Sequence, residues 1–129
     1  VDIAGGAEIS RNGTNVQIYA ANNTNAQKYK IIYNQTARAY QIYNETSKRR
    51  VDVDGAKIFA GTNIQTWDSN NSCAQLWRIR PRGDGTYNLF SLCSDKALDV
   101  EGGVARSATN VQLWAFNDTK AQIWSFTKL

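Results

Sequence analysis

The sequence predicts an all-β domain: a closed barrel with pseudo-threefold symmetry and negligible helix. One short phrase occurs three times in the 129 residues, and short strand-like runs alternate with turn-forming residues between its copies. No stretch of the chain has the hydrophobic period of about 3.6 residues that an amphipathic helix requires. Repeats with a period of about 20 to 50 residues are typical of repetitive architectures, so the repeated phrase is the main evidence for the fold.

The repeated phrase contains an Asp between two aliphatic residues, then a Gln two residues before an aromatic residue, then a second such Gln and aromatic. The first glutamines are 48 and 47 residues apart: Gln17, Gln65 and Gln112. The second glutamines have the same spacing: Gln27, Gln75 and Gln122. We therefore expect one domain over residues 1–129, with repeats at about 1–48, 49–96 and 97–129.

Runs of β-branched and aromatic residues predict the strands. They occupy residues 16–19, 29–33 and 40–43 in the first repeat, 64–67, 76–79 and 87–92 in the second, and 111–114 and 123–126 in the third. Asn, Asp, Ser, Thr and Gly lie between them, and Gly83-Asp84-Gly85 predicts a hairpin turn. Closely spaced strands indicate a sandwich or a barrel, and threefold repetition favours a barrel because closure removes exposed strand edges.

Composition excludes several classes of function. The chain has four Trp, six Tyr and four Phe, enough for a core, and a net charge of +4. Its dense basic patches, Lys48-Arg49-Arg50 and residues 78–82, are explained by solvated strand positions, so we expect no nucleic-acid partner. His is absent and only two Cys occur, so we expect no catalytic residues, no metal site and no cofactor. No apolar run predicts insertion into a membrane.

The start of the chain predicts a processed or excised fragment. Residue 1 is Val and no signal peptide is recognisable, so we expect a mature product or a domain taken from a larger protein.

Three in-register Gln-x-aromatic phrases, preceded in the third repeat by Leu98-Asp99-Val100, resemble the ricin B-chain type β-trefoil lectin family and its bacterial carbohydrate-binding modules. The resemblance covers nearly the whole chain. It implies a β-trefoil with four strands in each repeat. Eleven of these twelve strands are recognisable here. Either the missing strand lies upstream of Val1 in a longer parent chain, or the barrel closes imperfectly beside Asp2.

The aromatic residue of the first pair is a candidate sugar platform, because an aromatic ring meets the apolar face of a sugar while carboxylate and amide groups meet its hydroxyls. The candidate sites are Asp99, Trp114, Asn117 and Gln122; Asp52, Trp67, Asn70 and Gln75; and Asp2, Tyr19, Asn22 and Gln27. An alternative is that each Asp caps a turn before the glycines that follow it. The resemblance favours binding, because family sites use this Asp and this aromatic residue.

The second Gln and aromatic pair predicts core packing, with the Gln also at the edge of a pocket. The aromatic residues of this pair are Tyr29, Trp77 and Trp124. Many family members have Asn before this Gln, whereas this chain has Ala26, Ala74 and Ala121. We expect the nearby Asn22, Asn70 and Asn117 to supply the missing amide.

Cys73 and Cys93 flank the hairpin around Gly83. If residues 82–84 form the turn, facing residues have numbers that add up to 166, as these two do, so a disulfide is predicted. Two free, buried thiols are the alternative. A disulfide indicates a secreted or cell-surface protein.

These observations favour a non-catalytic, multivalent lectin module that anchors a parent protein to glycans. The resemblance implies galactose-type or plant cell-wall sugars as ligands, and a neighbouring catalytic or cell-surface domain. A protein-binding β-trefoil with degenerate sugar sites is the alternative. A hydrolase is disfavoured because the repeated acids occur once per repeat, whereas glycosidases pair two carboxyl groups across one bond.

Overall fold

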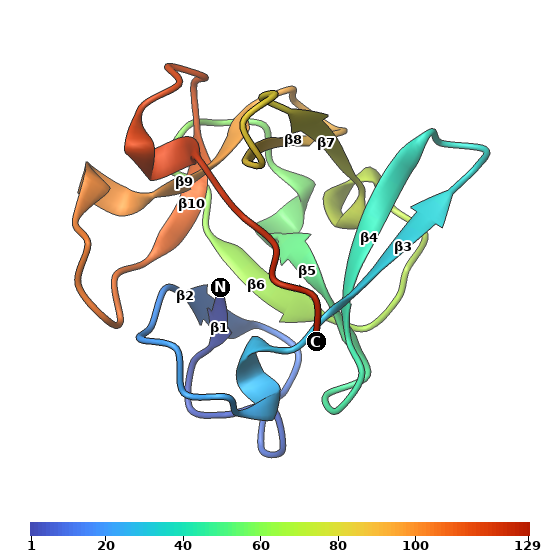
Figure 1. Cartoon of the computed structure of the whole chain (residues 1–129). Coiled ribbons are helices and arrows are strands. Elements are labelled where there is room, and N and C mark those ends of the chain that lie inside the picture. Colours follow the sequence, from blue (N-terminus) through green and yellow to red (C-terminus); the bar gives the residue numbers. More distant parts are fainter.

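A computed structural model describes all 129 residues as short strands joined by turns (Figure 1). It contains ten strands: β1 (Asp2–Ile3), β2 (Thr14–Gln17), β3 (Lys30–Asn34), β4 (Ala39–Asn44), β5 (Arg49–Val53), β6 (Ile64–Trp67), β7 (Trp77–Pro81), β8 (Tyr87–Ser91), β9 (Ala97–Val100) and β10 (Val111–Trp114). Five 3₁₀ turns of three residues accompany them: η1 (Asn25–Gln27), η2 (Asp54–Ala56), η3 (Cys73–Gln75), η4 (Glu101–Gly103) and η5 (Lys120–Gln122). The prediction of negligible helix is confirmed, and none of these turns has the length or apolar character of a membrane-spanning helix.

The strands form one antiparallel sheet in the order β1-β2-β6-β5-β4-β7-β8-β9-β10, with β3 paired to β4. Isolated bridges from Gln17 to Asn110 and from Asn63 to Gln112 join the third repeat back to the first two. These bridges close the sheet into a barrel. In Figure 1 the three repeats lie as lobes around a common centre, which confirms the predicted threefold barrel.

The third repeat has one strand fewer than expected. Residues 123–126 were expected to form a strand, but they pair only through an isolated bridge between Trp124 and Tyr87. β3 and β7 are each stabilised by a hairpin with the strand that follows, β4 and β8. No strand follows Trp124 in this chain, so the ladder does not extend beyond that bridge.

The barrel interior is filled by one apolar cluster: Val16, Ile42, Val51, Val53, Ile64, Ala74, Trp77, Leu89, Leu98, Val111 and Leu113. Trp77 has no exposed surface, and its Nε1–H donates to the Val51 carbonyl at 3.2 Å. The equivalent Trp124 packs against the same cluster and donates to the Leu98 carbonyl at 3.1 Å. Trp77 is therefore a core residue, as predicted, and Tyr29 and Trp124 are partly buried and pack against the same core.

Three asparagines, one per repeat, form a closed ring of hydrogen bonds that the sequence analysis did not anticipate. The Asn15 amide donates to Asn110 Oδ1 at 2.9 Å, and the Asn110 amide donates to Asn63 Oδ1 at 2.8 Å. The Asn63 amide completes the ring by donating to Asn15 Oδ1 at 2.8 Å. Each amide donates once and accepts once, so the ring satisfies half-buried polar groups and links all three repeats.

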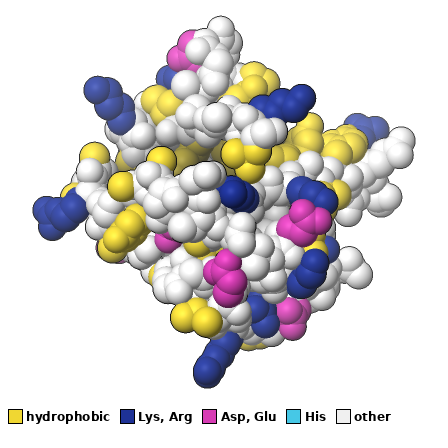
Figure 2. All heavy atoms as spheres, turned by 60° about the horizontal axis from the view of Figure 1, so that its bottom comes forward, with side chains coloured by type: hydrophobic (Ala, Val, Ile, Leu, Met, Phe, Trp, Pro, Cys, Tyr) yellow, Lys and Arg dark blue, Asp and Glu magenta, His cyan; other side chains and the backbone are white.

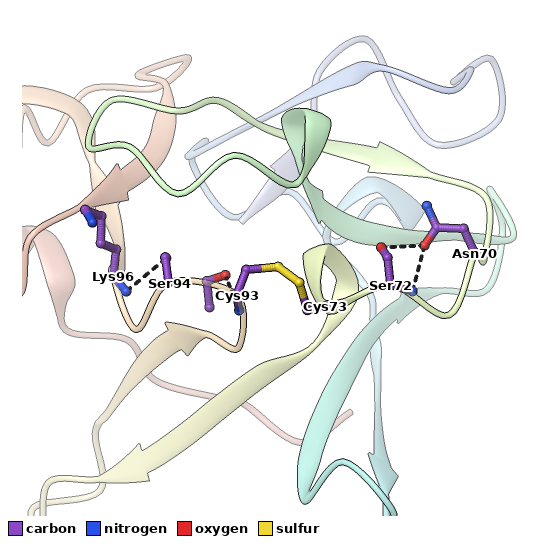
Figure 3. Close-up of a disulfide and its surroundings, with 7 residues drawn as sticks. Asn70, Ser72, Cys73, Cys93, Ser94 and Lys96 are labelled. Carbon is purple, nitrogen blue, oxygen red and sulfur yellow. Dashed lines mark hydrogen bonds between the residues drawn. A yellow bond between two sulfur atoms is a disulfide. The ribbon is translucent and has the colours of Figure 1, made fainter.

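Cys73 and Cys93 form a disulfide with a Cα–Cα distance of 5.2 Å (Figure 3), and no free cysteine remains. The bond joins η3 to the turn that follows β8. Ser72, next to Cys73, donates its hydroxyl to Asn70 Oδ1 at 2.7 Å, as Figure 3 shows. The disulfide therefore lies directly beside the loop that carries Asn70.

The register on which this pairing was predicted is wrong. Trp77 faces Ser91 and Ile79 faces Leu89, so facing residues have numbers that add up to 168 rather than 166. The turn is shifted by one residue, to residues 83–85, because the Arg82 N–H donates to the Thr86 carbonyl, and Gly83 and Gly85 have φ of 86° and 87°. Both cysteines lie beyond the ends of the β7–β8 ladder, where the strict register no longer applies.

The disulfide closes a loop with a sequence separation of 20 residues, which in the chain-entropy model stabilises the protein by about 3 kcal/mol. We expect the double variant Cys73→Ala/Cys93→Ala to lose about this much free energy of unfolding, measured by urea denaturation without reductant. A mass measurement on the non-reduced parent protein provides the control that the bond is formed. Equal stability of the oxidised parent and the variant would contradict the prediction.

Candidate functional site

Each repeat contains one Asp held by two Gln side chains, a cluster that we call the amide clamp. The Asp lies on β1, β5 or β9, and the first Gln faces it across the ladder on β2, β6 or β10. The second Gln is the last residue of η1, η3 or η5. The three clamps are Asp2 with Gln17 and Gln27, Asp52 with Gln65 and Gln75, and Asp99 with Gln112 and Gln122.

In every clamp the two amides occupy different carboxylate oxygens. The Gln112 amide donates to Asp99 Oδ1 at 3.1 Å, and the Gln122 amide donates to Oδ2 at 2.9 Å. The corresponding distances are 2.9 Å twice in the first repeat and 3.0 Å twice in the second. The alternative role as turn caps is therefore wrong, because the carboxylates bind glutamine amides rather than the backbone of the following turn.

The clamps stabilise carboxylates that are almost withdrawn from water. Asp2, Asp52 and Asp99 are 5%, 3% and 4% exposed. A buried carboxylate is costly unless it is hydrogen-bonded, and each of these receives two amide bonds. Burial raises the pKa of the Asp52 carboxyl, the two amide bonds lower it, and the nearby Asp54 raises it. Asp52 therefore takes up a proton at a higher pH than an ordinary aspartate does.

The second Gln also positions the loop that precedes it. In the third repeat the Gln122 amide donates to the Ala115 carbonyl at 2.9 Å, and its Oε1 accepts the Asn117 N–H at 2.9 Å. Equivalent pairs of bonds join Gln27 to Ala20 and Asn22, and Gln75 to Asp68 and Asn70. One side chain therefore connects the buried Asp to the exposed loop.

The loop asparagines each have a free amide donor. Oδ1 of Asn117 accepts the N–H and the hydroxyl of Thr119, at 3.1 and 2.8 Å. Asn22 and Asn70 bind Thr24 and Ser72 in the same way. The Nδ2 group of each asparagine donates to no protein atom and lies on the surface. These turns hold the side chain in place while leaving two N–H donors for another molecule.

The first aromatic of each phrase lies at the surface above its clamp. Tyr19, Trp67 and Trp114 are 49%, 38% and 42% exposed. Trp67 and Trp114 are the last residues of β6 and β10, two positions after the Gln of the clamp. Side chains two positions apart on a strand lie on the same face of the sheet, so the rings of Trp67 and Trp114 lie on the same side as their clamps.

All twelve candidate residues thus fall into three groups, each with a clamp Asp and Gln, a loop Asn and an exposed ring. Sequence reasoning missed the first Gln as part of the site, although its constant position two residues before the aromatic was a usable signal. Ala26 and Ala74 stand where many members of the resembled family have Asn. Both are buried within the apolar clusters, where their methyl groups contribute to packing.

On one face of the molecule the basic residues do not form a single patch. On the face in Figure 2 the Lys and Arg side chains are scattered among exposed hydrophobic and acidic ones. Several are paired with acids, such as Arg82 with Asp118 at 3.1 Å and Lys30 with Glu45 at 2.8 Å. The modest basic excess therefore creates no broad positive surface on this face.

Comparison with known families gives a match to a model described as ricin-type beta-trefoil lectin domain-like. It matches three overlapping stretches, residues 1–67, 34–114 and 73–129, which together span the chain. No curated protein sequence matches significantly.

Several solved structures share the fold. The designed threefold-symmetric protein ThreeFoil has a TM-score of 0.94 at 27% identity, over 100% of this chain and 90% of its own. The Rhizoctonia solani agglutinin has a TM-score of 0.82 at 20% identity, over 97% of this chain and 83% of its own. The exo-β-1,3-galactanase 1,3Gal43A of Clostridium thermocellum has a TM-score of 0.87 at 22% identity, over 96% of this chain but 26% of its own. The fold is therefore a β-trefoil.

The clamp predicts a structural cost for Asp99→Asn. The substitution replaces one acceptor oxygen by an amide that faces the donating amide of Gln112 or Gln122. We expect the free energy of unfolding to fall by about 1–3 kcal/mol, as for a buried polar group without a partner. Urea denaturation measures the change. Glu101→Gln removes a charge at an exposed position two residues away and should change stability by less than about 0.5 kcal/mol. Equal effects of the two variants would mean that the clamp contributes nothing specific.

Proposed function

Because the chain belongs to the ricin-type β-trefoil lectin domain-like family, we propose that it is a non-catalytic carbohydrate-binding module with three shallow sugar sites. The observation that carries the proposal is the threefold recurrence of one arrangement: a clamped carboxylate, an exposed aromatic ring and an asparagine with a free amide. Membership of this family and likeness to an agglutinin suggest carbohydrate binding.

The chemistry of each group fits a sugar. A carboxylate has about four lone-pair positions, so a clamped Asp with two amide donors retains acceptor capacity for sugar hydroxyls. The free Nδ2 of Asn117 donates to a hydroxyl oxygen, and the ring of Trp114 packs against the apolar C–H face. The glutamines hold the carboxylate and loop in position before binding, which reduces the ordering that the sugar must impose.

A non-catalytic role is supported by the state of the carboxylates. A glycosidase requires two carboxyl groups about 5–10 Å apart across one bond, one of them free to transfer a proton. Each clamp contributes one carboxylate, and both of its oxygens are bound by amides. A turnover assay on a glycan panel tests this part of the proposal, and release of reducing ends would overturn it.

We also propose that the module anchors a larger secreted or cell-surface protein to glycans. The chain spans 26% of the galactanase and 15% of the mosquitocidal holotoxin that share its fold. Those proteins support a role as one part of an enzyme or toxin, and the galactanase supports galactose-type or plant cell-wall sugars as ligands. The disulfide supports an oxidising, extracytoplasmic environment.

The proposal is tested by titrating the protein with monosaccharides and then with multivalent glycans carrying the same sugar. A shallow site with one ring and few polar contacts should have a Kd on the order of mM. Three sites on one barrel should bind a multivalent glycan more tightly per sugar, through effective concentration. Absence of binding to any glycan would favour a protein-binding β-trefoil instead.

Trp114→Ala should separate binding from stability. The ring is 42% exposed, so we expect weaker sugar binding at the third site, by about tenfold or more, with little loss of stability. Trp77 is the second aromatic of the second repeat and is fully buried. Trp77→Ala should instead lower the free energy of unfolding by about 3–5 kcal/mol. Binding isotherms and urea denaturation on both variants provide the comparison. Similar loss of stability in the two variants would place Trp114 in the core.

A further inference from the structure

A groove lined by arginines and aromatic rings lies next to the third site. It encloses about 580 Å³ between the β7–β8 hairpin, β4 and the loop after β10. The residues that matter here are Arg38, Arg78, Arg80, Phe90 and Phe116. Nothing in the three amide clamps uses these side chains.

The strand register places the groove close to the third site. Ala97 on β9 faces both Phe90 on β8 and Trp114 on β10. Neighbouring strands are about 4.8 Å apart, so Phe90 and Trp114 are separated by about 10 Å of sheet, on the same face. Phe116 also follows Trp114 by two residues, on the loop that Gln122 holds. A ligand on Trp114 with a second sugar unit can therefore reach the groove.

Arg80 is held in position by the two rings. Its guanidinium carbon lies 5.2 Å from the Phe90 ring centre and 4.8 Å from that of Phe116. One terminal nitrogen donates to Asn88 Oδ1 at 2.8 Å, and Arg80 forms no ion pair. Its remaining N–H groups are free, and a guanidinium fixed by stacking loses little entropy when it binds an oxyanion.

The charge in the groove is positive. Arg38 and Arg80 have no carboxylate partner among the ion pairs, and Arg78 is paired with Asp95. Three arginines therefore face one acid along this groove. Guanidinium groups bind carboxylates and sulfates through paired hydrogen bonds, which are stronger than neutral ones.

Only the loop of the third site can complete this arrangement. The positions equivalent to Phe116 are Ala21 and Ser69, which have no ring to stack on an arginine. The loop is also fixed to the hairpin, because Arg82 donates to both carboxylate oxygens of Asp118 at 3.1 and 3.2 Å. The third loop therefore presents Phe116 to Arg80 in a defined position.

We propose that this groove is a subsite for an anionic sugar unit, one bearing a carboxylate or a sulfate, adjacent to the sugar that packs on Trp114. The inference rests on the proposed sugar binding and deepens it, since it assigns the third site a ligand class that the other two sites do not share. Arg80 is the main anion contact, and Phe116 supplies a second apolar surface.

The test compares matched neutral and charged glycans in two sets by titration calorimetry. The sets are lactose, 3′-sulfated lactose and 3′-sialyllactose, and xylotetraose with and without a glucuronic acid branch. The charged member of at least one set should bind about tenfold more tightly than its neutral parent. Comparing the sulfated glycan with those that carry a carboxylate shows which of the two anions the groove prefers. Equal affinity within both sets, or no binding at all, would overturn the subsite.

Variants then locate the effect. Arg80→Gln should remove the tenfold advantage of the charged glycan and leave neutral binding unchanged, and Arg80→Lys should restore only part of it. Arg106→Gln removes the same charge from an exposed position on the loop between β9 and β10 and should have little effect. An equal loss in Arg106→Gln would assign the preference to general charge, which overturns the subsite.

Failure of the subsite and failure of the sugar site give different results. Trp114→Ala should weaken neutral and charged glycans alike. Neutral binding without any anionic advantage rejects only the subsite. Charged glycans that bind the Trp114→Ala variant as well as the parent would show that the groove acts alone, which contradicts the proposed continuity. Unchanged thermal unfolding of Arg80→Gln is the control for folding.

Discussion

The hydrogen bonds between one buried carboxylate and two glutamine amides are the interaction on which this molecule depends. The first amide, as in the Asp52–Gln65 pair, joins two facing strand residues and so helps to fix the register of the ladder. If one strand slipped by one residue relative to the other, the Asp and Gln side chains would lie on opposite faces of the sheet, and their hydrogen bond would break. The second amide extends the same contact to an irregular loop. Strand pairing and loop position are therefore set by one small polar cluster, repeated three times.

Because each clamp fixes both the barrel and the loop, its residues tolerate few substitutions. A change at Asp99 or Gln122 alters barrel and loop together, because both groups are buried and mutually bonded. The exposed ring and the loop residues around Asn117 are less constrained, since few protein contacts depend on their outer surfaces. Phe116 illustrates this freedom, as its equivalents are Ala21 and Ser69 on loops held by the same glutamine. A constant polar frame with variable loops allows three sites to differ while the fold is kept.

The sequence predicted what its period could specify. Equivalent residues have equivalent surroundings, so the lobes, the buried Trp77 and the exposed Trp114 followed from spacing and residue type. Contacts between repeats could not be predicted in this way, because the period identifies equivalent residues but does not show which residues are in contact. The asparagine ring was missed for this reason, as was the stacking of Arg80 on Phe116. The hairpin register was displaced by one residue, because the turn is centred on Asp84, between two positive-φ glycines, rather than on Gly83.

The ring of Asn15, Asn63 and Asn110 bears on how the chain reaches this structure. Its three hydrogen bonds join residues 48, 47 and 95 positions apart, so no single repeat can form any of them. Contacts between distant residues form only after the entropy of closing long loops has been overcome, which makes folding slow. The ring therefore forms only when all three lobes have assembled. Bonds that form last in folding break first in unfolding, so the ring slows unfolding and prolongs the lifetime of the native state.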